Sequence, residues 1–360
     1  MDLERKIDLV SRPPVEEVLT RDELRSLFET NEHPKHYIGF EISGKIHVGS
    51  GVMTALKVKD FIEAGVKPTI FLADFHTWIN NKLGGDMEKI REVARGYFTA
   101  GFVSLGLSEE KVDYVLASEL YDLDYWSDVV RVSKATTLAR MQRCMVIMGR
   151  TENEAVESAS MMYPAMQAAD IFKQDLDIIH AGMDQRKVHI LAREVAEKLG
   201  RKKPVAVHAH LLQGLQQASR MGYDTDVKKD MEISGKMSKS KPGSCIYIHD
   251  SEEEIAEKLK NAYCPPKIVE GNPVMELCKY VLLREEGKTL LVERPQKFGG
   301  SVEFASISEL SKAYGEGTLH PMDLKGAVSR ELSIMLKPCR EYFAKRPELI
   351  AQINEASVTR

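Results

Sequence analysis

Residues 36–50 read HYIGFEISGKIHVGS, and this stretch decides the fold of the chain. Its first part, Tyr37 to Glu41, is a short apolar run that predicts a buried strand. Its second part, His47 to Ser50, precedes a helical spacing of apolar residues that stops at Gly65. A strand followed by a glycine-containing turn and a helix is typical of the first unit of a parallel α/β sheet.

Further strands are predicted where short apolar runs stand between helical patterns. These runs lie at residues 68–74, 114–118, 176–181 and 205–207, and long helical patterns cover residues 86–106 and 125–148. Because strands and helices alternate, we expect an α/β fold with a Rossmann-like, mainly parallel sheet and helices on both faces. Beyond about residue 250 the pattern is largely helical, which predicts a mainly helical C-terminal domain.

The pattern divides the chain into three parts. Residues 1–32 are predicted to be a helical segment, in which Thr20 and Glu23 have capping-box spacing. Residues 33–230 form the Rossmann-like domain with a connective helical insertion at about 105–160, and residues 231–360 hold a lysine-containing loop and the helical domain. Residues 213–232 lack periodicity and are predicted to be a loop, whereas residues 352–360 are expected to be frayed.

Composition excludes several classes of protein. The 360 residues are 43% hydrophobic and 29% charged, with a net charge of −4, as in ordinary globular proteins. No apolar run approaches the roughly 20 residues that span a bilayer, and the first residues lack the apolar core of a signal peptide, so a cytoplasmic location is expected. The five cysteines form no Cys-x-x-Cys pair, which predicts reduced thiols and no metal site.

A second motif, GKMSKSKP, stands at residues 235–242. Lys236 and Lys239 lie three residues apart on a Gly- and Ser-rich loop, where their ammonium groups can swing onto a triphosphate and neutralise its charge. In the first motif, Gly49 permits a close approach of a ligand to the backbone, and His47 can donate a hydrogen bond to a phosphate. Each motif alone has an ordinary alternative, a chance helix start or a solvated basic loop, but together they favour a nucleotide site.

Three polar side chains share one face of a predicted helix. Tyr163, Gln167 and Asp170 are separated by four and three residues and stand among apolar neighbours. A buried glutamine or aspartate is costly unless it is paired, so this face is a plausible floor for a ligand. The alternative for a single tyrosine is core packing with a satisfied hydroxyl, but a buried aspartate is harder to explain that way.

These motifs resemble those of class I aminoacyl-tRNA synthetases, and the amino-acid residues resemble the tyrosyl-tRNA synthetases of the archaeal and eukaryotic type. The resemblance covers residues from about 15 to 345. It implies a catalytic role for His47, Gly49, Lys236 and Lys239, and ATP contacts that also include Ser50, Met237 and Ser238. Ser50 departs from the family pattern, which usually has a second histidine there.

The same resemblance implies a tyrosine site. Tyr37 and Asp170 would bracket the phenol hydroxyl of the substrate, and the α-ammonium group would be held by Tyr163, Gln167 and Gln185. Phe71 and Ala73 would line the ring pocket, with His76 close by. The implied reaction activates L-tyrosine with Mg-ATP and then transfers the tyrosyl group to the 3′-terminal ribose of tRNA(Tyr), without a tightly bound prosthetic group.

For the RNA partner, the resemblance implies contacts from both domains. The acceptor stem would meet Arg140, Arg143, Arg186 and Lys187, for each of which the alternative is a solvated helix face. In the helical domain, which would bind the anticodon, Phe298 would stack on the first anticodon base and Asp323 would hydrogen-bond it. Relatives are dimers, so a homodimer is expected, and no membrane partner is.

Three other functions stay open at this stage. A tryptophanyl-tRNA synthetase shares the fold and both nucleotide motifs, but the pairing of Tyr37 with Asp170 argues against it. A catalytically silent relative that binds RNA or tyrosine is disfavoured by His47, Gly49 and the two lysines, although Ser50 keeps it open. A small-molecule adenylyltransferase is disfavoured by the motifs around Phe298 and Asp323.

Overall fold

The computed structural model describes residues 1–149, 157–219, 226–238 and 243–358. The chain forms two compact units, and each is discontinuous in sequence. Unit 1 comprises Met1–Gly44, Lys57–His210 and Glu348–Arg360, and unit 2 comprises Lys45–Leu56 and Leu211–Pro347. The domain boundaries given above stay a prediction.

Unit 1 is built on a six-stranded sheet in the order β1-β6-β5-β2-β3-β4. All neighbouring pairs are parallel except β1 and β6, which are antiparallel, so the predicted mainly parallel sheet is confirmed. The strand order reverses between β2 and β5, and ligands of such sheets bind at that point, beyond the carboxyl ends of the strands. The strands are β1 (Val15–Leu19), β2 (Lys35–Phe40), β3 (Lys67–Leu72), β4 (Asp113–Leu116), β5 (Ile178–Gly182) and β6 (Val205–Ala209).

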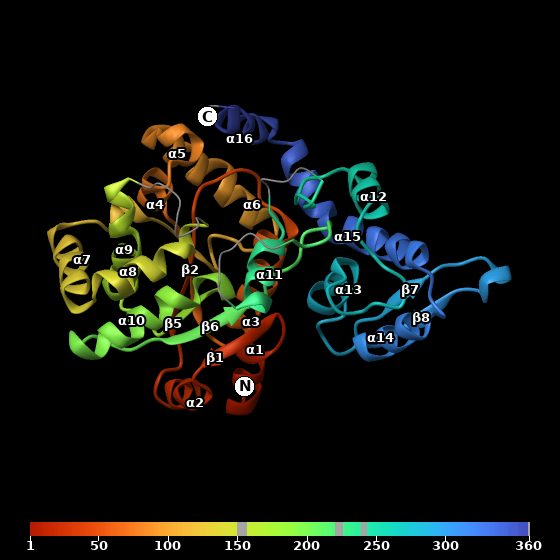
Figure 1. Cartoon of the computed structure of the whole chain (residues 1–360), viewed down its shortest axis with the longest axis horizontal. Helices are drawn as coiled ribbons and strands as arrows, with labels where there is room; N and C mark the ends of the chain where they lie inside the picture. The colour runs from red at the N-terminus through yellow and green to blue at the C-terminus, as the bar shows by residue number, and fades with distance from the viewer. Residues whose placement is uncertain (150–156, 220–225, 239–242, 359–360) are drawn as a thin grey trace. The chain divides into compact units, whose positions relative to one another are not determined.

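Helices cover both faces of this sheet (Figure 1). On one face Ile179 and Ala206 pack in a core with residues of α7, α9 and α10, and on the other Ile178 and Val205 pack with α1, α2 and the end of α3. Alternate residues of one strand therefore enter different cores, as the pleat requires. The helices are α1 (Leu3–Ser11), α2 (Arg21–Thr30), α3 (Met53–Glu63), α4 (Asp74–Ile79), α5 (Met87–Val93), α6 (Thr99–Ser104), α7 (Leu123–Ala135), α8 (Leu138–Cys144), α9 (Tyr163–Lys173) and α10 (Arg186–Lys198).

The N-terminal segment is only partly as predicted. Thr20 and Glu23 form the expected reciprocal capping box at the start of α2. The prediction of a wholly helical segment is wrong at Val15–Leu19, which forms strand β1. This strand is short and lies at the edge of the sheet, where it pairs with a segment almost 200 residues later, so local sequence carries little signal for it.

The two long helical patterns are both interrupted. Residues 86–106 form α5 and α6 joined by a π-helical turn, Ala94–Phe98. The single helix predicted over 125–148 is wrong at Thr136, where α7 has ended. The side chain of Thr137 then accepts a hydrogen bond from the Arg140 N–H at 3.2 Å and caps the new helix α8. A threonine cap inside a helical pattern is the physical reason for the break.

Residues 352–358 are helical, contrary to the fraying expected from residue 352 onward, whereas residues 359 and 360 lie outside the described residues. Helix α16 (Pro347–Val358) lies beside α5 (Figure 1). Gln352 donates a hydrogen bond to Glu92, Lys89 donates one to the Glu355 carbonyl, and Ile353 is fully buried. The last helix therefore belongs to unit 1 rather than to the preceding helices.

Unit 2 is mainly helical, as predicted, with a two-stranded antiparallel sheet. Its elements are α11 (Val227–Gly235), α12 (Glu252–Lys260), α13 (Pro273–Leu277), β7 (Leu290–Val292), β8 (Val302–Phe304), α14 (Ile307–Glu316) and α15 (Pro321–Ala344). The loop predicted at 213–232 is wrong from Val227 onward. Two polar residues of α11, Asp230 and Ser234, are buried and hydrogen-bonded to each other, so its inward face does not read as apolar.

No helix in the described part of the chain has both the length and the apolar character that a membrane span requires. The five cysteines are all buried.

Candidate functional site

Asp170 lies at the centre of a buried polar cluster in unit 1. It belongs to α9, which starts at Tyr163 with Pro164 in its first turn, a favourable place for proline. The Asp170 side chain is 2% exposed, and so is Tyr37 on β2. His76, on the short helix α4 that follows β3, is equally buried. Three elements at the carboxyl side of the sheet thus bring together residues predicted from the sequence.

The direct hydrogen-bond donor to Asp170 is Tyr121, which sequence reasoning missed. Its hydroxyl donates to Asp170 Oδ1 at 2.9 Å, and His76 Nε2 lies 3.6 Å from Oδ2. Tyr121 stacks on Tyr125 with ring centroids 3.8 Å apart. Tyr121 precedes α7 and Tyr125 lies in its first turn, four residues later, and this spacing alone does not predict a contact with Asp170.

Burial sets the charge state of the cluster. It raises the pKa of Asp170 to about 8, although the hydrogen bond from Tyr121 acts in the opposite direction. It lowers the pKa of His76 to about 3, so this imidazole is neutral at physiological pH. Burial, and next the nearby Asp170 carboxylate, raise the pKa of the Tyr37 phenol. The cluster is therefore rich in neutral hydroxyls that surround one carboxyl group.

The residues predicted to hold an ammonium group also come together. The Tyr163 hydroxyl donates to Glu41 Oε1 at 2.7 Å, and its ring meets His76 edge-on with centroids 4.5 Å apart. Gln167 Nε2 lies 3.4 Å from Gln185 Oε1, at the turn after β5. Glu41, at the end of β2, was missed, because a single glutamate after a strand carries no specific signal.

The predicted ring residues line the end of β3. Phe71 and Ala73 are both buried, and the Phe71 ring packs edge-on against Tyr37 with centroids 5.8 Å apart. Both residues belong to the same apolar core as Tyr37 and Tyr163. The residues that the sequence predicted for a tyrosine site therefore form one group in unit 1.

In unit 2, the two nucleotide motifs lie in direct contact. The Val48 N–H donates to the Ile246 carbonyl, and the Met237 N–H donates to the Leu212 carbonyl. A Cβ atom placed on Gly49 would lie 3.2 Å from Met237 Cβ and 3.2 Å from His47 Nδ1. Glycine at this position therefore lets segments about 190 residues apart in sequence pack backbone against side chain.

Ser50 has a structural task in this turn. Its N–H donates to His47 Nδ1 at 3.3 Å, and its hydroxyl oxygen accepts from the His47 N–H at 3.4 Å. Because Nδ1 accepts a hydrogen bond, a neutral His47 carries its proton on Nε2. Lys236 and Ser238 lie in the described part of the second motif, whereas Lys239 lies outside the described residues.

The candidate acceptor-stem residues lie on α8 and α10. Arg186, the first residue of α10, makes a two-pronged ion pair with Glu17, with N–O distances of 2.7 and 2.8 Å. Arg140 pairs with Glu194 at 3.3 Å. Arg143 is exposed and Lys187 half-buried. The four residues therefore lie on two helices that contact each other.

In the helical unit, Phe298 is 60% exposed on a 3-10 turn, Gln296–Phe298. Its ring lies under the Lys297 ammonium at 4.9 Å. A phenylalanine that anchors a loop would be buried, so its exposure favours a stacking role over the structural alternative. Asp323 lies in the first turn of α15 and is half-buried.

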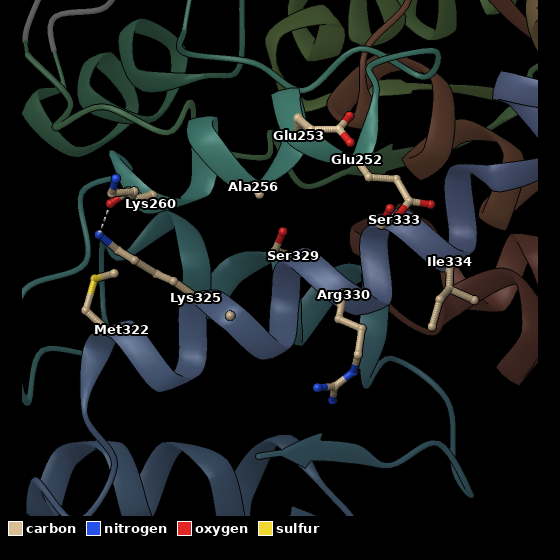
Figure 2. Close-up of a pocket in the computed structure, with 11 residues that line it drawn as sticks. Glu252, Glu253, Ala256, Lys260, Met322, Lys325, Ser329, Arg330, Ser333 and Ile334 are labelled. Carbon is tan, nitrogen blue, oxygen red and sulfur yellow. Dashed lines mark hydrogen bonds between the residues drawn. The ribbon is translucent and has the colours of Figure 1, made fainter. Parts of the chain in front are cut away.

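An open groove of about 640 Å³ runs between α12 and α15 in unit 2 (Figure 2). Met322 and Lys325 line it and flank Asp323 in sequence, and Lys325 donates a hydrogen bond to the Lys260 carbonyl across it. Ile334 lines the same α15 wall, and Glu252 and Glu253 of α12 line the other. Its mixed charge and open form do not indicate one class of ligand.

Comparison with protein families decides the identity of the chain. The family described as "tRNA synthetases class I (W and Y)" matches residues 29–226 and 229–337, which is most of the chain. The chain belongs to this family.

Individual synthetases agree with this assignment and confirm the resemblance stated from the motifs. The chain is 50% identical to the tyrosine--tRNA ligase of Thermococcus sibiricus, over the full length of both chains. The crystal structure of a tyrosyl-tRNA synthetase complexed with L-tyrosine, from Pyrococcus horikoshii, superposes with a TM-score of 0.93 at 48% identity. That match covers 98% of this chain and 100% of the other.

A tryptophanyl-tRNA synthetase from Aeropyrum pernix is similar in fold alone. It is 19% identical, with a TM-score of 0.73, and the match covers 98% of this chain and 90% of that synthetase. The contrast with the tyrosine-type synthetases weighs against the tryptophan alternative.

Proposed function

We infer that this chain is a tyrosine–tRNA ligase, as the motifs predicted and as full-length similarity to curated ligases of that name supports. The tyrosine carboxylate attacks the α-phosphorus of ATP, tyrosyl-adenylate forms and pyrophosphate leaves. A terminal ribose hydroxyl of tRNA then takes the tyrosyl group. Neither step needs a protein nucleophile, so the residues act by positioning the reactants and stabilising charge.

The observation that carries the choice of amino acid is the buried carboxyl group of Asp170 among hydroxyl groups. We propose that it accepts the phenol hydroxyl of the substrate, with Tyr37 and Tyr121 beside it. A phenylalanine side chain would leave this buried group without its partner, and a buried polar group left unsatisfied costs about 1–3 kcal/mol. The distance of 2.9 Å from Tyr121 to Asp170 supports a carboxyl group already oriented before substrate arrives.

We propose that Tyr163, Gln167 and Gln185 bind the α-ammonium group of the substrate. We add Glu41 to this set. The Tyr163 hydroxyl already donates to Glu41, so its oxygen lone pairs remain available to accept from an ammonium group. The carboxylate of Glu41 supplies the negative charge that the three neutral residues lack. Phe71 and Ala73 supply apolar contact for the ring.

ATP activation is assigned to the two motifs of unit 2. The His47 side chain, with its proton on Nε2, donates to charge that develops on the α-phosphate. Lys236 and Lys239 neutralise the leaving pyrophosphate, and Gly49, Ser50, Met237 and Ser238 shape the turn that they share. Magnesium arrives with ATP as part of the substrate, and divalent ions held this way are bound mainly by phosphate oxygens.

Transfer RNA is assigned to both units. Arg140, Arg143, Arg186 and Lys187 would contact the acceptor stem, whereas Phe298 would stack on an anticodon base that Asp323 hydrogen-bonds. The exposed Phe298 ring supports this role. A homodimer and a cytoplasmic location complete the proposal. An apolar surface for the dimer is offered by the exposed Leu123 and Val130 on α7.

The test is exchange of labelled pyrophosphate into ATP, run separately with each of the twenty amino acids. We expect signal with tyrosine alone. Signal with tryptophan would indicate the tryptophan-type alternative, and signal with none would indicate a silent relative.

A variant tests the residue that carries the specificity. Asp170→Asn keeps the shape but replaces the carboxyl acceptor with an amide. We expect the preference for tyrosine over phenylalanine in kcat/KM for exchange to fall at least tenfold. An unchanged preference would remove Asp170 from the phenol site.

A further inference from the structure

Arg186 is not a freely mobile cation on the surface of α10. Its Nε and Nη2 atoms donate side by side to the two oxygens of Glu17, at 2.7 and 2.8 Å. Glu17 belongs to β1, the edge strand that pairs with β6. A guanidinium group has five N–H donors in a planar fork, so this pair uses two and leaves three. Nη1 has no protein partner among the residues that the structure describes, and the side chain is 36% exposed.

Glu17 is also hydrogen-bonded to the first of two buried histidines that form a chain, His208 and His189. Its Oε2 atom also contacts His208 Nδ1 at 2.8 Å, and His208 Nε2 contacts His189 Nδ1 at 3.0 Å. His208 lies on β6, and His189 lies on α10 one turn after Arg186. The four side chains therefore close a ring: from Arg186 through Glu17, His208 and His189 back to the helix that carries Arg186.

The hydrogen-bond directions in this ring are fixed by charge. Burial lowers the pKa of His208 and of His189, so both imidazoles are neutral. Burial alone would raise the pKa of Glu17, but the bonds and charge of Arg186, with the bond from His208, hold it below its usual range. An ionised Glu17 only accepts, so His208 donates from Nδ1 and accepts at Nε2 from His189.

We propose that Glu17, His208 and His189 are positioning residues that aim the three outward N–H groups of Arg186 at a pair of hydrogen-bond acceptors on the acceptor end of tRNA. The proposal rests on the assignment of Arg186 to RNA binding made above. Because Glu17 compensates the charge of Arg186, the contact depends on the direction of the planar fork and little on net charge.

Glu17→Gln tests the ring with an almost isosteric change. Both Glu17 oxygens accept from Arg186, so in either orientation the amide nitrogen faces an Arg186 N–H and the ring cannot keep all its bonds. We expect the KM for tRNA in aminoacylation to rise about tenfold, while kcat and the KM for tyrosine in pyrophosphate exchange stay within about twofold. Glu17→Asp, which keeps the charge but retracts the carboxylate, is the second variant, with the same expected direction.

The neighbouring residue on β1 supplies a matched control. Glu16 also pairs with a histidine, His210, at 2.5 Å, and it lies where the register of β1 against β6 shifts. Glu16→Gln should leave the KM for tRNA unchanged. If Glu17→Gln instead lowers exchange and aminoacylation together, the ring only stabilises the fold and the proposal is wrong.

Variants of Arg186 separate this inference from the assignment on which it rests. Arg186→Lys keeps the charge but lacks the fork, and we expect it to raise the KM for tRNA as much as Arg186→Ala. In the Arg186→Ala background, Glu17→Gln should add nothing further. Additive effects, or an effect of Arg186→Ala without one of Glu17→Gln, would overturn the positioning role alone. No effect of Arg186→Ala would overturn both.

Discussion

At the scale of single residues, the structure gives Asp170 an unusual environment for a carboxyl group. It is almost fully buried, with one tyrosine hydroxyl at hydrogen-bond distance and a neutral histidine beside it. Such a group is costly to ionise without a ligand, because burial disfavours its charged form.

This environment predicts a pH-dependent penalty in stability. The pKa of Asp170 rises from 3.8 to about 8 on folding, so the folded state holds a proton that the unfolded chain releases. The free energy of unfolding contributed by this group is therefore fully present below pH 4 and is lost as the pH rises toward 8, by up to about 1.4 kcal/mol per pH unit. Asp170→Asn should be more stable than the wild type at pH 8, with a smaller difference at pH 5.

Urea unfolding of both proteins at the two pH values measures this. A stability difference that does not depend on pH would show that Asp170 is ionised at both pH values. It would contradict the statement that burial raises the pKa of Asp170.

The site was predictable where side chains repeat along one element. Tyr163, Gln167 and Asp170 share a helix face, so their spacing along the chain is enough to predict that they act together. Tyr121 and Glu41 reach the same cluster from separate segments, and only tertiary packing brings them there. No local periodicity encodes such a contact.

At the scale of elements, the contact between the turn at Gly49 and the segment at Met237 is the main finding. The sequence predicted that both motifs serve one nucleotide site, but it did not predict the two bridges that hold them, His47 to Tyr247 and Gln213 to Lys236. Chain segments this far apart in sequence meet only after the unit has folded.

Gly49→Ala tests whether this close packing matters for catalysis. The new methyl group would lie 3.2 Å from Met237 Cβ, closer than most side-chain carbons approach, so one motif must shift. We expect kcat/KM for ATP in pyrophosphate exchange to fall about tenfold, with the dissociation constant for tyrosine little changed.

The matched control is Gly315→Ala on α14. A methyl group there would meet nothing within 4 Å, and alanine is the better helix former. It should leave ATP kinetics unchanged. Equal effects of the two variants would mean that general disturbance of unit 2, rather than contact between the motifs, is responsible.

At the scale of the whole molecule, neither compact unit is a continuous stretch of sequence. The alternating strands and helices predicted the parallel sheet, because periodicity is a local property. The packing of α16 on unit 1 was not predictable, since the apolar spacing of an amphipathic helix does not identify the surface against which it packs.

Ile353→Ala tests how much the last helix contributes to unit 1. This side chain is fully buried on α16, and truncation of a buried isoleucine costs about 2–5 kcal/mol. We expect the free energy of unfolding to fall by that amount. Ile334→Ala on α15 is the control, because its side chain is 62% exposed and should cost less than about 0.5 kcal/mol. Similar losses in both variants would contradict the docking of α16.

The position of α16 also bears on how the protein is made. A ribosome adds Glu92 to the chain 260 residues before Gln352, yet the two side chains are hydrogen-bonded in the finished fold. The surface of unit 1 that α16 covers therefore stays exposed until residues 348–358 have left the ribosome. Nascent chains that stall before the final helix would be the species most in need of a chaperone.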